Sequence, residues 1–388
     1  LKPRLLFLSH AGSRNGATIL LLHLLRWLRS QTNYEFDVLV NGGGELLDEF
    51  RAVGPTKVWR SPAFLLGSLP GRWRAALKPR LEAQLLKGLL RGRHYDLVHL
   101  NTVANWQHVP FLATRSRSLL WHVHELEYAV RLITGGEGWR QTFPLARRFV
   151  AASSAVRDAL VKEFNVPSDK VDLVHEFIPI VNLSSEDRKL RRQRVRKELG
   201  WPEDAFVVGG CGTLGWRKGT DLFLQAARAI HVKGSENIRF LWVGGGEKGE
   251  DSLQFAHDIR AMGLPDRCKW IASTANVLDY YCAMDVFALT SREDPFPLVM
   301  LETAALGLPV VCFENSGGGP EFVGKDAGLV APYADAGAFA AQLTTLHENQ
   351  ELRRRLGAEA ACRVQTTYTV ERQAPKLLRS MERSMEPS

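Results

Sequence analysis

Two carboxylates lie around the start of an apolar helix in the segment TSREDPFPLVMLETAALGLPVVCFE, at residues 290–314. Asp294 is in the loop before this helix, and Glu302 lies eight residues further along the chain. Prolines before the helix and a glycine after it favour these limits, and a buried strand is expected to follow. Burial of an unpaired carboxylate costs on the order of several kcal/mol. We therefore expect Glu302 to have a partner, either an arginine across the core or a ligand hydroxyl.

A loop with two adjacent cations is the second group of residues that could do chemistry. Arg217 and Lys218 lie in GTLGWRKG, at residues 212–219, between an expected strand and an expected helix. Two cations beside a glycine suit a diphosphate, and a solvated basic turn is the alternative. The GxxxxGK[ST] order of a P-loop is absent from this segment, which argues against P-loop nucleotide hydrolysis.

Two further turns in the first half of the sequence carry polar residues. HAGSRNGAT, at residues 10–18, brings Gly16 to the start of an expected helix, where backbone amides could receive an anion or simply form a tight turn. WHVHE ends an expected strand and puts His122 and His124 on one face. No cysteine or acidic cluster with zinc spacing accompanies them, and the sequence has no Asp-x-Asp pair. We therefore expect His124 to bind a ligand by hydrogen bonding, with a satisfied edge histidine as the alternative, and we expect no metal.

Length and composition indicate an ordinary globular protein with more than one domain. The 388 residues are 45% hydrophobic and 24% charged, with a formal net charge of +8. This charge could favour nucleic acid, anionic lipid or a phosphorylated small molecule, and it does not choose among them. The five cysteines are scattered through apolar segments, which predicts reduced core residues in a reducing compartment. We expect neither a membrane-spanning helix nor a secretory signal.

Apolar runs typical of strands alternate with helical stretches along the whole chain. In the first half they lie at residues 4–9, 36–40, 96–100, 118–123 and 148–153, and in the second half at 205–212, 239–246, 268–272, 285–290 and 309–313. This alternation predicts two consecutive Rossmann-like domains with parallel sheets covered on both faces. Ligands of such sheets bind outside the carboxyl ends of the strands, where the polar turns lie. The end of the chain predicts an amphipathic helix.

One stretch between these elements is strongly basic, with a single acidic residue, Glu82. Its cations are Arg72, Arg74, Lys78, Arg80, Lys87, Arg91 and Arg93. Leucines at helical spacing give residues 72–93 an amphipathic pattern, so the stretch could lie on an anionic membrane or face an acidic acceptor. A solvated helix face is the ordinary alternative. The basic cluster from Arg188 to Lys197 is mixed with acids and predicts a helix surface.

Several of these motifs, taken in chain order, resemble one enzyme family. They are the Gly16 turn, His124-Glu125, Ala152-Ser153-Ser154, Arg217-Lys218-Gly219, Val243-Gly244-Gly245-Gly246, the acidic pair Asp294 and Glu302, and Gly317-Gly318-Gly319-Pro320-Glu321. Their order is similar to that of the retaining nucleotide-sugar glycosyltransferases with the GT-B fold, the large family four, or group 1. The resemblance spans nearly the whole chain.

The resemblance implies an α/β fold of two Rossmann-like domains that face a central cleft. Residues 1–180 would hold the acceptor, residues 181–368 would hold the nucleotide-sugar, and residues 369–388 would form a helix that crosses back to the first domain. It implies catalytic roles for His124, Asp294, Arg217 and Lys218. It implies donor-binding roles for Gly16, Gly244, Ile271, Glu293, Phe296, Leu298, Val299 and Glu302.

The same resemblance implies what these side chains do. Glu302 would bind the ribose hydroxyls, Asp294 the hydroxyls of the transferred sugar, and His124 the sugar near its reacting carbon. The cations would neutralise the departing diphosphate, aided by backbone amides of the helix start. The family is described by front-face attack, in which the leaving phosphate helps to deprotonate the acceptor.

Three positions depart from the family pattern. Asp294 is one methylene shorter than the usual glutamate, and Glu293 beside it could take its place. Thr213 stands where many members have an arginine, so Arg217 would supply the second cation. Glu176-Phe177 replaces a frequent Asn-Gly. These changes leave the donor open.

The functional expectation is a metal-independent, hexosyltransferase-like enzyme without a cofactor. It would transfer a sugar to a glycan or lipid-linked acceptor in polysaccharide or glycoconjugate biosynthesis, and it would not bind nucleic acid. We expect a cytoplasmic protein, with residues 72–93 as a candidate peripheral contact at the inner face of a membrane. The alternatives are a nucleotide-sugar epimerase or another GT-B enzyme such as a phosphorylase, and a non-catalytic nucleotide-binding or nucleic-acid-binding module.

Overall fold

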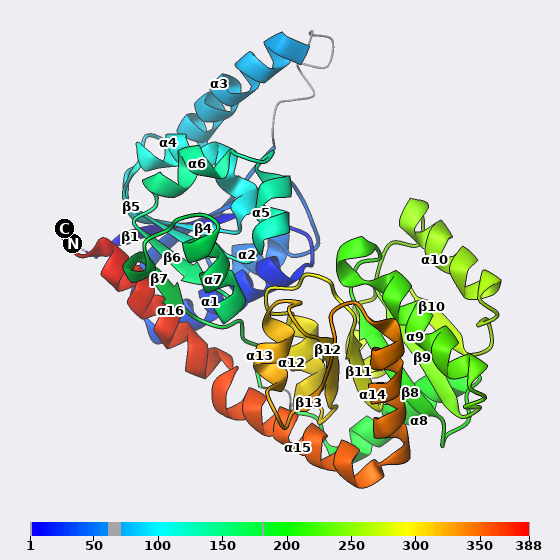
Figure 1. Cartoon of the computed structure of the whole chain (residues 1–388). Coiled ribbons are helices and arrows are strands. Elements are labelled where there is room, and N and C mark those ends of the chain that lie inside the picture. Colours follow the sequence, from blue (N-terminus) through cyan, green and yellow to red (C-terminus); the bar gives the residue numbers. More distant parts are fainter. Residues whose placement is uncertain (1, 61–70, 181, 388) are drawn as a thin grey trace. The chain divides into compact units, whose positions relative to one another are not determined.

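The chain folds into two compact units, each built around its own parallel sheet (Figure 1). The structure, a computed structural model, describes residues 2–60, 71–180 and 182–387, without the side chains of residues 71–76 and 78–80. Unit 1 consists of Leu1–Phe177 together with Val370–Ser388, and unit 2 consists of Ile178–Thr369. The boundaries expected from the sequence, at residues 180 and 368, lie within a few residues of these limits.

The sheet of unit 1 has seven parallel strands in the order β3-β2-β1-β4-β5-β6-β7. The strands are β1 (Arg4–Ser9), β2 (Glu35–Asn41), β3 (Thr56–Trp59), β4 (Tyr95–Asn101), β5 (Ser116–Val123), β6 (Arg148–Ala151) and β7 (Val171–Leu173). Leu5, Leu6, Phe7 and Leu8 of β1 have no exposed surface, because helices cover both faces of the sheet. A strand buried on both faces is expected to contain a continuous apolar run, and β1 has one in these four residues.

Two helices of unit 1 start at a polar side chain that caps them. Asn15 caps α1 by accepting a hydrogen bond from the Thr18 amide at 3.1 Å, and Ser153 caps α7 in the same way. The helices are α1 (Gly16–Gln31), α2 (Leu47–Val53), α3 (Gly71–Leu89), α4 (Val109–Ala113), α5 (Glu127–Ile133), α6 (Trp139–Thr142), α7 (Ser154–Lys162) and α16 (Val370–Met385).

The last helix, α16, belongs to unit 1 although it follows the whole of unit 2 in sequence. Its apolar side, which includes Leu377 and Met381, is buried against β4, β5, β6 and α1. Two polar contacts fix its position, one between the Ser384 and Ser118 hydroxyls at 2.6 Å and one between Arg383 and Asp172 at 2.6 Å. The expected amphipathic helix at the end of the chain is therefore present and returns to the first unit.

The sheet of unit 2 has six parallel strands in the order β10-β9-β8-β11-β12-β13. The strands are β8 (Phe206–Cys211), β9 (Ile238–Val243), β10 (Cys268–Ile271), β11 (Val286–Leu289), β12 (Val310–Phe313) and β13 (Gly328–Ala331). The helices are α8 (Ser185–Glu198), α9 (Thr220–Val232), α10 (Glu250–Ala261), α11 (Val277–Ala283), α12 (Leu298–Ala305), α13 (Gly318–Val323), α14 (Ala336–Glu348) and α15 (Gln350–Thr367). In each sheet the first strand in sequence lies in the interior. The next strands are added toward one edge, and the later strands are then added toward the other edge, as the predicted Rossmann-like order requires.

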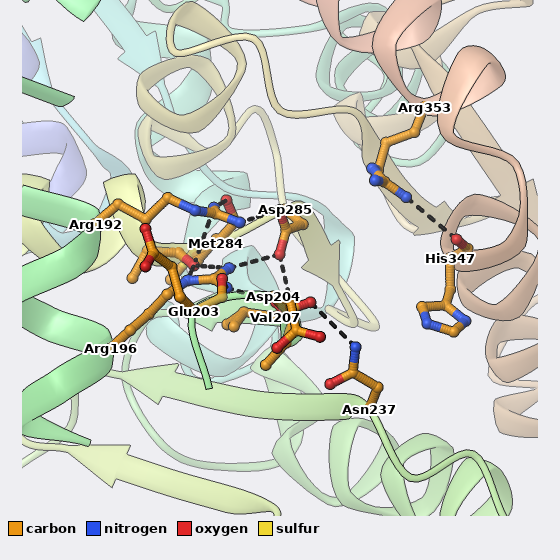
Figure 2. Close-up of polar contacts among 12 residues, drawn as sticks. Arg192, Arg196, Glu203, Asp204, Val207, Asn237, Met284, Asp285, His347 and Arg353 are labelled. Carbon is orange, nitrogen blue, oxygen red and sulfur yellow. Dashed lines mark hydrogen bonds and ion pairs between the residues drawn. The ribbon is translucent and has the colours of Figure 1, made fainter. Parts of the chain in front are cut away.

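Arginines attach α8 to the sheet of unit 2 (Figure 2). Arg196 is only 1% exposed, and its guanidinium donates to three backbone carbonyl oxygens and, at 2.7 Å, to the carboxylate of Asp285. Arg192 binds the other oxygen of Asp285 at 2.7 Å, and the Val207 amide also donates to this carboxylate. Two cations of the cluster at residues 188–197 thus bind the start of β11, while Lys189, Arg194 and Lys197 are exposed as expected of a helix surface. A buried guanidinium is tolerated here because nearly all of its donors are satisfied.

The basic stretch at residues 72–93 is described only in part. Most of its cations lie among the side chains that are outside the described residues, so the proposed membrane contact stays a prediction. Of the cations that are described, Lys87 and Arg91 are exposed and Arg93 is paired with Asp37 at 3.1 Å. Among the described helices, none is both long and apolar enough to cross a bilayer.

Candidate functional site

The expected site residues of unit 2 gather at the carboxyl edge of its sheet. Strands β8 and β11 are neighbours, but β8 leads on to β9 on one side of the sheet and β11 leads on to β12 on the other. The loops that follow β8 and β11 therefore diverge, and such a topological switch point is where α/β sheets bind ligands. The loop after β8 contains Arg217 and Lys218, and the loop after β11 contains Asp294. Residues that are far apart in the sequence therefore belong to one edge of one rigid sheet.

A glycine lets these two loops touch. Gly219 has a left-handed φ of 63°, and a Cβ atom there would lie 1.9 Å from the backbone oxygen of Thr290. The Thr290 hydroxyl in turn donates to the backbone oxygen of Lys218 at 3.1 Å. The loop with the cations can approach the β11 loop this closely only because residue 219 has no side chain.

Lys218 and Asp294 form an ion pair across the two loops. The Lys218 Nζ and Asp294 Oδ2 atoms are 2.5 Å apart, and the side chains are 13% and 6% exposed. The Ser291 hydroxyl donates to the same carboxylate oxygen at 3.1 Å. Backbone hydrogen bonds to Ser316 and Gly318 hold the Asp294 main chain in place. The cation and the carboxylate that were expected to bind different parts of a donor are thus next to each other.

Arg217 lies in the same loop as Lys218, but its side chain contacts the main chain of the β11 loop. Its guanidinium donates to the backbone oxygen of Glu293 at 3.0 Å. A second arginine, Arg292, fixes the loop through a bidentate pair with Asp221, at 2.8 and 2.7 Å, and lies over the Trp216 ring. Bidentate pairing gives fixed geometry, so Arg292 and Asp221 act as a clamp on the loop. Arg292 lies in the segment 290–314 and Asp221 follows the cationic loop, but neither was given a role from sequence, because their pairing depends on the fold that brings the two loops together.

Glu302 lies on α12, and the hydroxyl of Tyr281 donates to its Oε2 atom at 3.0 Å. Leu298 and Val299 form the first turn of the same helix, where backbone amides have no partner within the helix itself. The helix begins directly after the Asp294 loop, so its amides and the two acids belong to one continuous segment of 290–305.

The other expected donor-binding residues differ in how their side chains lie. Gly244 follows β9 with a φ of 121°, and a Cβ atom there would lie 2.3 Å from the Gly212 oxygen. Ile271 ends β10, and its oxygen accepts a hydrogen bond from the Gly244 amide at 2.8 Å. Phe296 is 1% exposed and packs on the ring of Tyr368, with ring centroids 5.2 Å apart. Its ring is therefore part of an aromatic core.

Gly16 and His124 lie at the carboxyl edge of the unit 1 sheet, after β1 and β5. The two ring nitrogens of His124 are both engaged, Nδ1 with Glu176 Oε1 and Nε2 with Asn101 Oδ1, each at 3.0 Å. Glu125, next in the chain, accepts from the Val103 and His124 amides and so fixes the end of the strand. Sequence reasoning noted Glu176 only as a departure from the family, and it did not identify Asn101.

Three other histidines surround this position and are held neutral by burial. Desolvation, and then the charge of His124, lower the pKa of His99 to about 3 and that of His10 to about 4. The same causes lower the pKa of His122 well below its usual value, with a further contribution from His99. The His122 ring lies 4.0 Å from the His124 ring and 5.6 Å from the His99 ring.

Acid should therefore destabilise unit 1. A histidine whose pKa is lower in the folded than in the unfolded state binds more protons when unfolded, so stability falls as the pH drops below about 6.5 and continues to fall toward the folded pKa. Replacing His99 by phenylalanine, beside the Phe7 ring, should reduce the slope of unfolding free energy against pH by up to about 1.4 kcal/mol per pH unit. Denaturant unfolding at pH 4.5 to 7 measures this slope, with the exposed His94→Phe variant as control. Equal slopes in the wild type and His99→Phe would contradict the assignment.

Metal ligation is a separate question for these histidines and acids. Within residues 2–60, 71–180 and 182–387, no group of three or more His, Cys, Asp or Glu side chains could hold a metal ion. The carboxylates nearest the cationic loop are engaged with Lys218 and Tyr281.

Comparison with known structures places the two parallel sheets in the GT-B fold. Anabaena HepE, solved in complex with UDP-glucose, has a TM-score of 0.79 over 98% of this chain and 100% of its own, at 21% identity. Residues 14–181 match the profile described as Glycosyltransferase Family 4, and residues 191–363 match Glycosyl transferases group 1. The chain belongs to the group 1 glycosyltransferases and is a glycosyltransferase by this membership.

Two curated relatives align over shorter parts of the chain. The D-inositol 3-phosphate glycosyltransferase of Kineococcus radiotolerans is 29% identical over 76% of this chain and 73% of its own length. The amylovoran biosynthesis glycosyltransferase AmsD of Erwinia amylovora is also 29% identical, over 40% of this chain and 42% of its own length.

Proposed function

We propose that the protein is a retaining glycosyltransferase that moves a sugar from a nucleotide-sugar to a hydroxyl of a glycan or lipid-linked acceptor. The observation that carries this proposal is the convergence of Lys218, Asp294 and the start of α12 at the switch point of unit 2. A cation, a carboxylate and helix amides within one segment provide partners for a phosphate and for sugar hydroxyls. HepE was solved with UDP and with UDP-glucose, which makes uridine diphosphate sugars the first donors to test.

In this proposal the residues keep the roles that the resemblance implies. Lys218 and Arg217 neutralise the leaving diphosphate, with the amides of Leu298 and Val299 as additional donors. Asp294 binds hydroxyls of the transferred sugar, with Glu293 as the alternative, and Glu302 binds the ribose. Gly244, Ile271 and Phe296 shape the donor site through their backbone and packing.

Retention of configuration requires an explanation because hydrolases achieve it with two carboxylates, one of them a nucleophile. Asp294 is held by Lys218 and Ser291, which suits a binding carboxylate better than a nucleophile. We therefore propose front-face substitution, in which the bond from the anomeric carbon to the phosphate oxygen breaks and the acceptor oxygen bonds from the same side. The acceptor proton passes to the departing phosphate, so that no protein base is consumed. No metal ion or cofactor takes part in this proposal.

The acceptor is proposed more broadly than the donor. The name of the Kineococcus relative includes D-inositol 3-phosphate, so a polyhydroxylated acceptor is the first class to test. We also propose that the transfer belongs to polysaccharide or glycoconjugate biosynthesis, where acceptors are of this polyhydroxylated kind. A cytoplasmic location with a peripheral membrane contact is part of the same proposal.

A donor screen with a matched variant tests the proposed activity. UDP-, GDP-, TDP- and ADP-sugars are compared by thermal shift at equal concentration, because a ligand that binds the folded state alone raises Tm, and a tighter ligand raises it more. One donor class should raise Tm, and Glu302→Ala should abolish that shift and reduce transfer. Glu348→Ala, which removes an exposed carboxylate from α14 of the same unit, serves as a control for loss of a carboxylate.

Three outcomes would contradict the proposal. The first is full transfer by Glu302→Ala, and the second is the absence of a shift with every donor. The third is interconversion of the donor sugar without any acceptor, which would indicate an epimerase. Product analysis by NMR distinguishes retention from inversion at the anomeric carbon.

A further inference from the structure

Three polar side chains form a chain of contacts that ends at the carboxylate of Glu302. Tyr281 is in the middle, on α11, with its hydroxyl 3.0 Å from Glu302 Oε2 and 3.4 Å from the sulfur of Cys211. Cys211 is the last residue of β8, immediately before the loop that carries the cations. Three elements of unit 2 thus meet at one phenol oxygen that is almost completely buried.

The direction of these hydrogen bonds follows from the number of protons available. A phenol has one proton, and a carboxylate is a stronger acceptor than a thiol, so Tyr281 donates to Glu302. The thiol of Cys211 can then donate to the lone pairs of the phenol oxygen. Burial raises the pKa of the Cys211 thiol to about 12, and burial, followed by the charge of Glu302, raises the pKa of Tyr281 well above its usual value. Both groups therefore keep their protons at neutral pH.

A donor that never ionises has a specific effect on the carboxylate it contacts. It occupies one side of Oε2 and removes the freedom of the Glu302 side chain to rotate away, which a glutamate on a helix otherwise has. A carboxylate held in one orientation can accept hydrogen bonds from two adjacent hydroxyl groups at once. A side chain that rotates freely binds one hydroxyl about as well as two.

We propose that Tyr281 is a positioning residue that orients Glu302 toward both ribose hydroxyls and thereby gives the site its preference for ribonucleotides over 2′-deoxyribonucleotides. This inference rests on the proposed function, in which Glu302 binds the ribose. It adds a residue, a direction of hydrogen bonding and a specificity to that site. It also explains why a tyrosine hydroxyl is buried beside a carboxylate instead of a phenylalanine ring.

The test compares UDP with 2′-deoxy-UDP in the wild type, Tyr281→Phe and Tyr280→Phe. Tyr280 precedes Tyr281 on the same helix and is half-buried, so it controls for loss of a tyrosine hydroxyl from α11. Kd is measured by calorimetry, and KM and kcat are measured with the donor sugar. We expect Tyr281→Phe to reduce the ratio of the two Kd values about tenfold and to raise KM while kcat changes little, because a hydrogen bond to a charged group is lost. Tyr280→Phe should keep the wild-type ratio.

A milder variant keeps the inference testable if Tyr281→Phe folds poorly. Cys211→Ala removes the thiol donor at the far end of the chain and should reduce the same ratio by a smaller factor. A lower Tm in both variants with an unchanged ratio would overturn the inference and leave Tyr281 with a packing role. Tight binding of UDP by a wild type that does not discriminate against 2′-deoxy-UDP would also overturn it, while leaving the proposed transferase intact. A wild type that binds no nucleotide would overturn both.

Discussion

Lys218→Met should lower kcat for sugar transfer by about 10²–10³-fold, which is the loss seen when one preorganised electrostatic donor is removed from a transition state. The charge that develops on a leaving diphosphate would lose its nearest cation. The same variant should unfold more easily, by about 3 kcal/mol, because Asp294 would remain buried without its partner. Activity assays and denaturant unfolding measure the two effects separately.

A double variant separates the chemical from the structural effect. Lys218→Met combined with Asp294→Asn removes both charges and leaves the Ser291 hydroxyl to bind the amide oxygen. Its unfolding free energy should return close to the wild-type value, while its kcat should stay at or below that of the single variant. Recovery of transfer together with stability would show that Lys218 acts only through the fold.

The contact between Lys218 and Asp294 is compatible with donor binding. An ammonium group has three donors, and the pair with Asp294 uses one of them. Lys218 can therefore bind a phosphate oxygen while it still holds the carboxylate. This arrangement would link the diphosphate end of a donor to the carboxylate that is proposed to bind its sugar.

Most strands could be predicted from sequence, including the short edge strand β10, and three short edge strands could not. Strands such as RLLFLS and IRFLWV contain an unbroken apolar run because helices cover both faces of the sheet. The strands TKVW, VDL and GLVA lie at or beside the edges of their sheets and are only three or four residues long. Such short segments contain too few apolar residues to differ from a loop.

The loops of the site could be predicted because their geometry requires particular residues. Glycines 219 and 244 occur where another backbone comes within 2.3 Å of a would-be Cβ atom, and such glycines form recognisable motifs. Partners could not be predicted, because they depend on which distant segments the fold brings together. For Glu302 the sequence offered an arginine or a ligand hydroxyl, and the structure adds the phenol of Tyr281. Phe296 lies in a motif, yet its ring packs inward on Tyr368.

The pair of His124 and Glu176 shows how one departure from the family motif changes the hydrogen-bond partners of a buried histidine. The Asn101 amide nitrogen donates to the Ala17 oxygen at 2.9 Å, so the amide oxygen faces His124 Nε2, which must carry a proton. His124 Nδ1 faces a carboxylate oxygen of Glu176, and two acceptors cannot share this contact. One of the two groups must therefore donate in this contact, and both side chains are buried.

Glu176→Ala should destabilise unit 1 by about 3–5 kcal/mol, because it leaves His124 buried without a partner for Nδ1. Glu176→Gln should cost less than about 1.5 kcal/mol, because the amide group can donate to Nδ1 and keep a hydrogen bond at this contact. Nitrogen NMR of the His124 ring should show whether the environment of Nδ1 changes in Glu176→Gln. Asp48→Ala, which removes the carboxylate of an exposed pair in the same unit, should have little effect. Equal stability of Glu176→Ala and the wild type would contradict a stabilising role for the buried contact, and equal transfer by Glu176→Gln would show that catalysis does not need a carboxylate at residue 176.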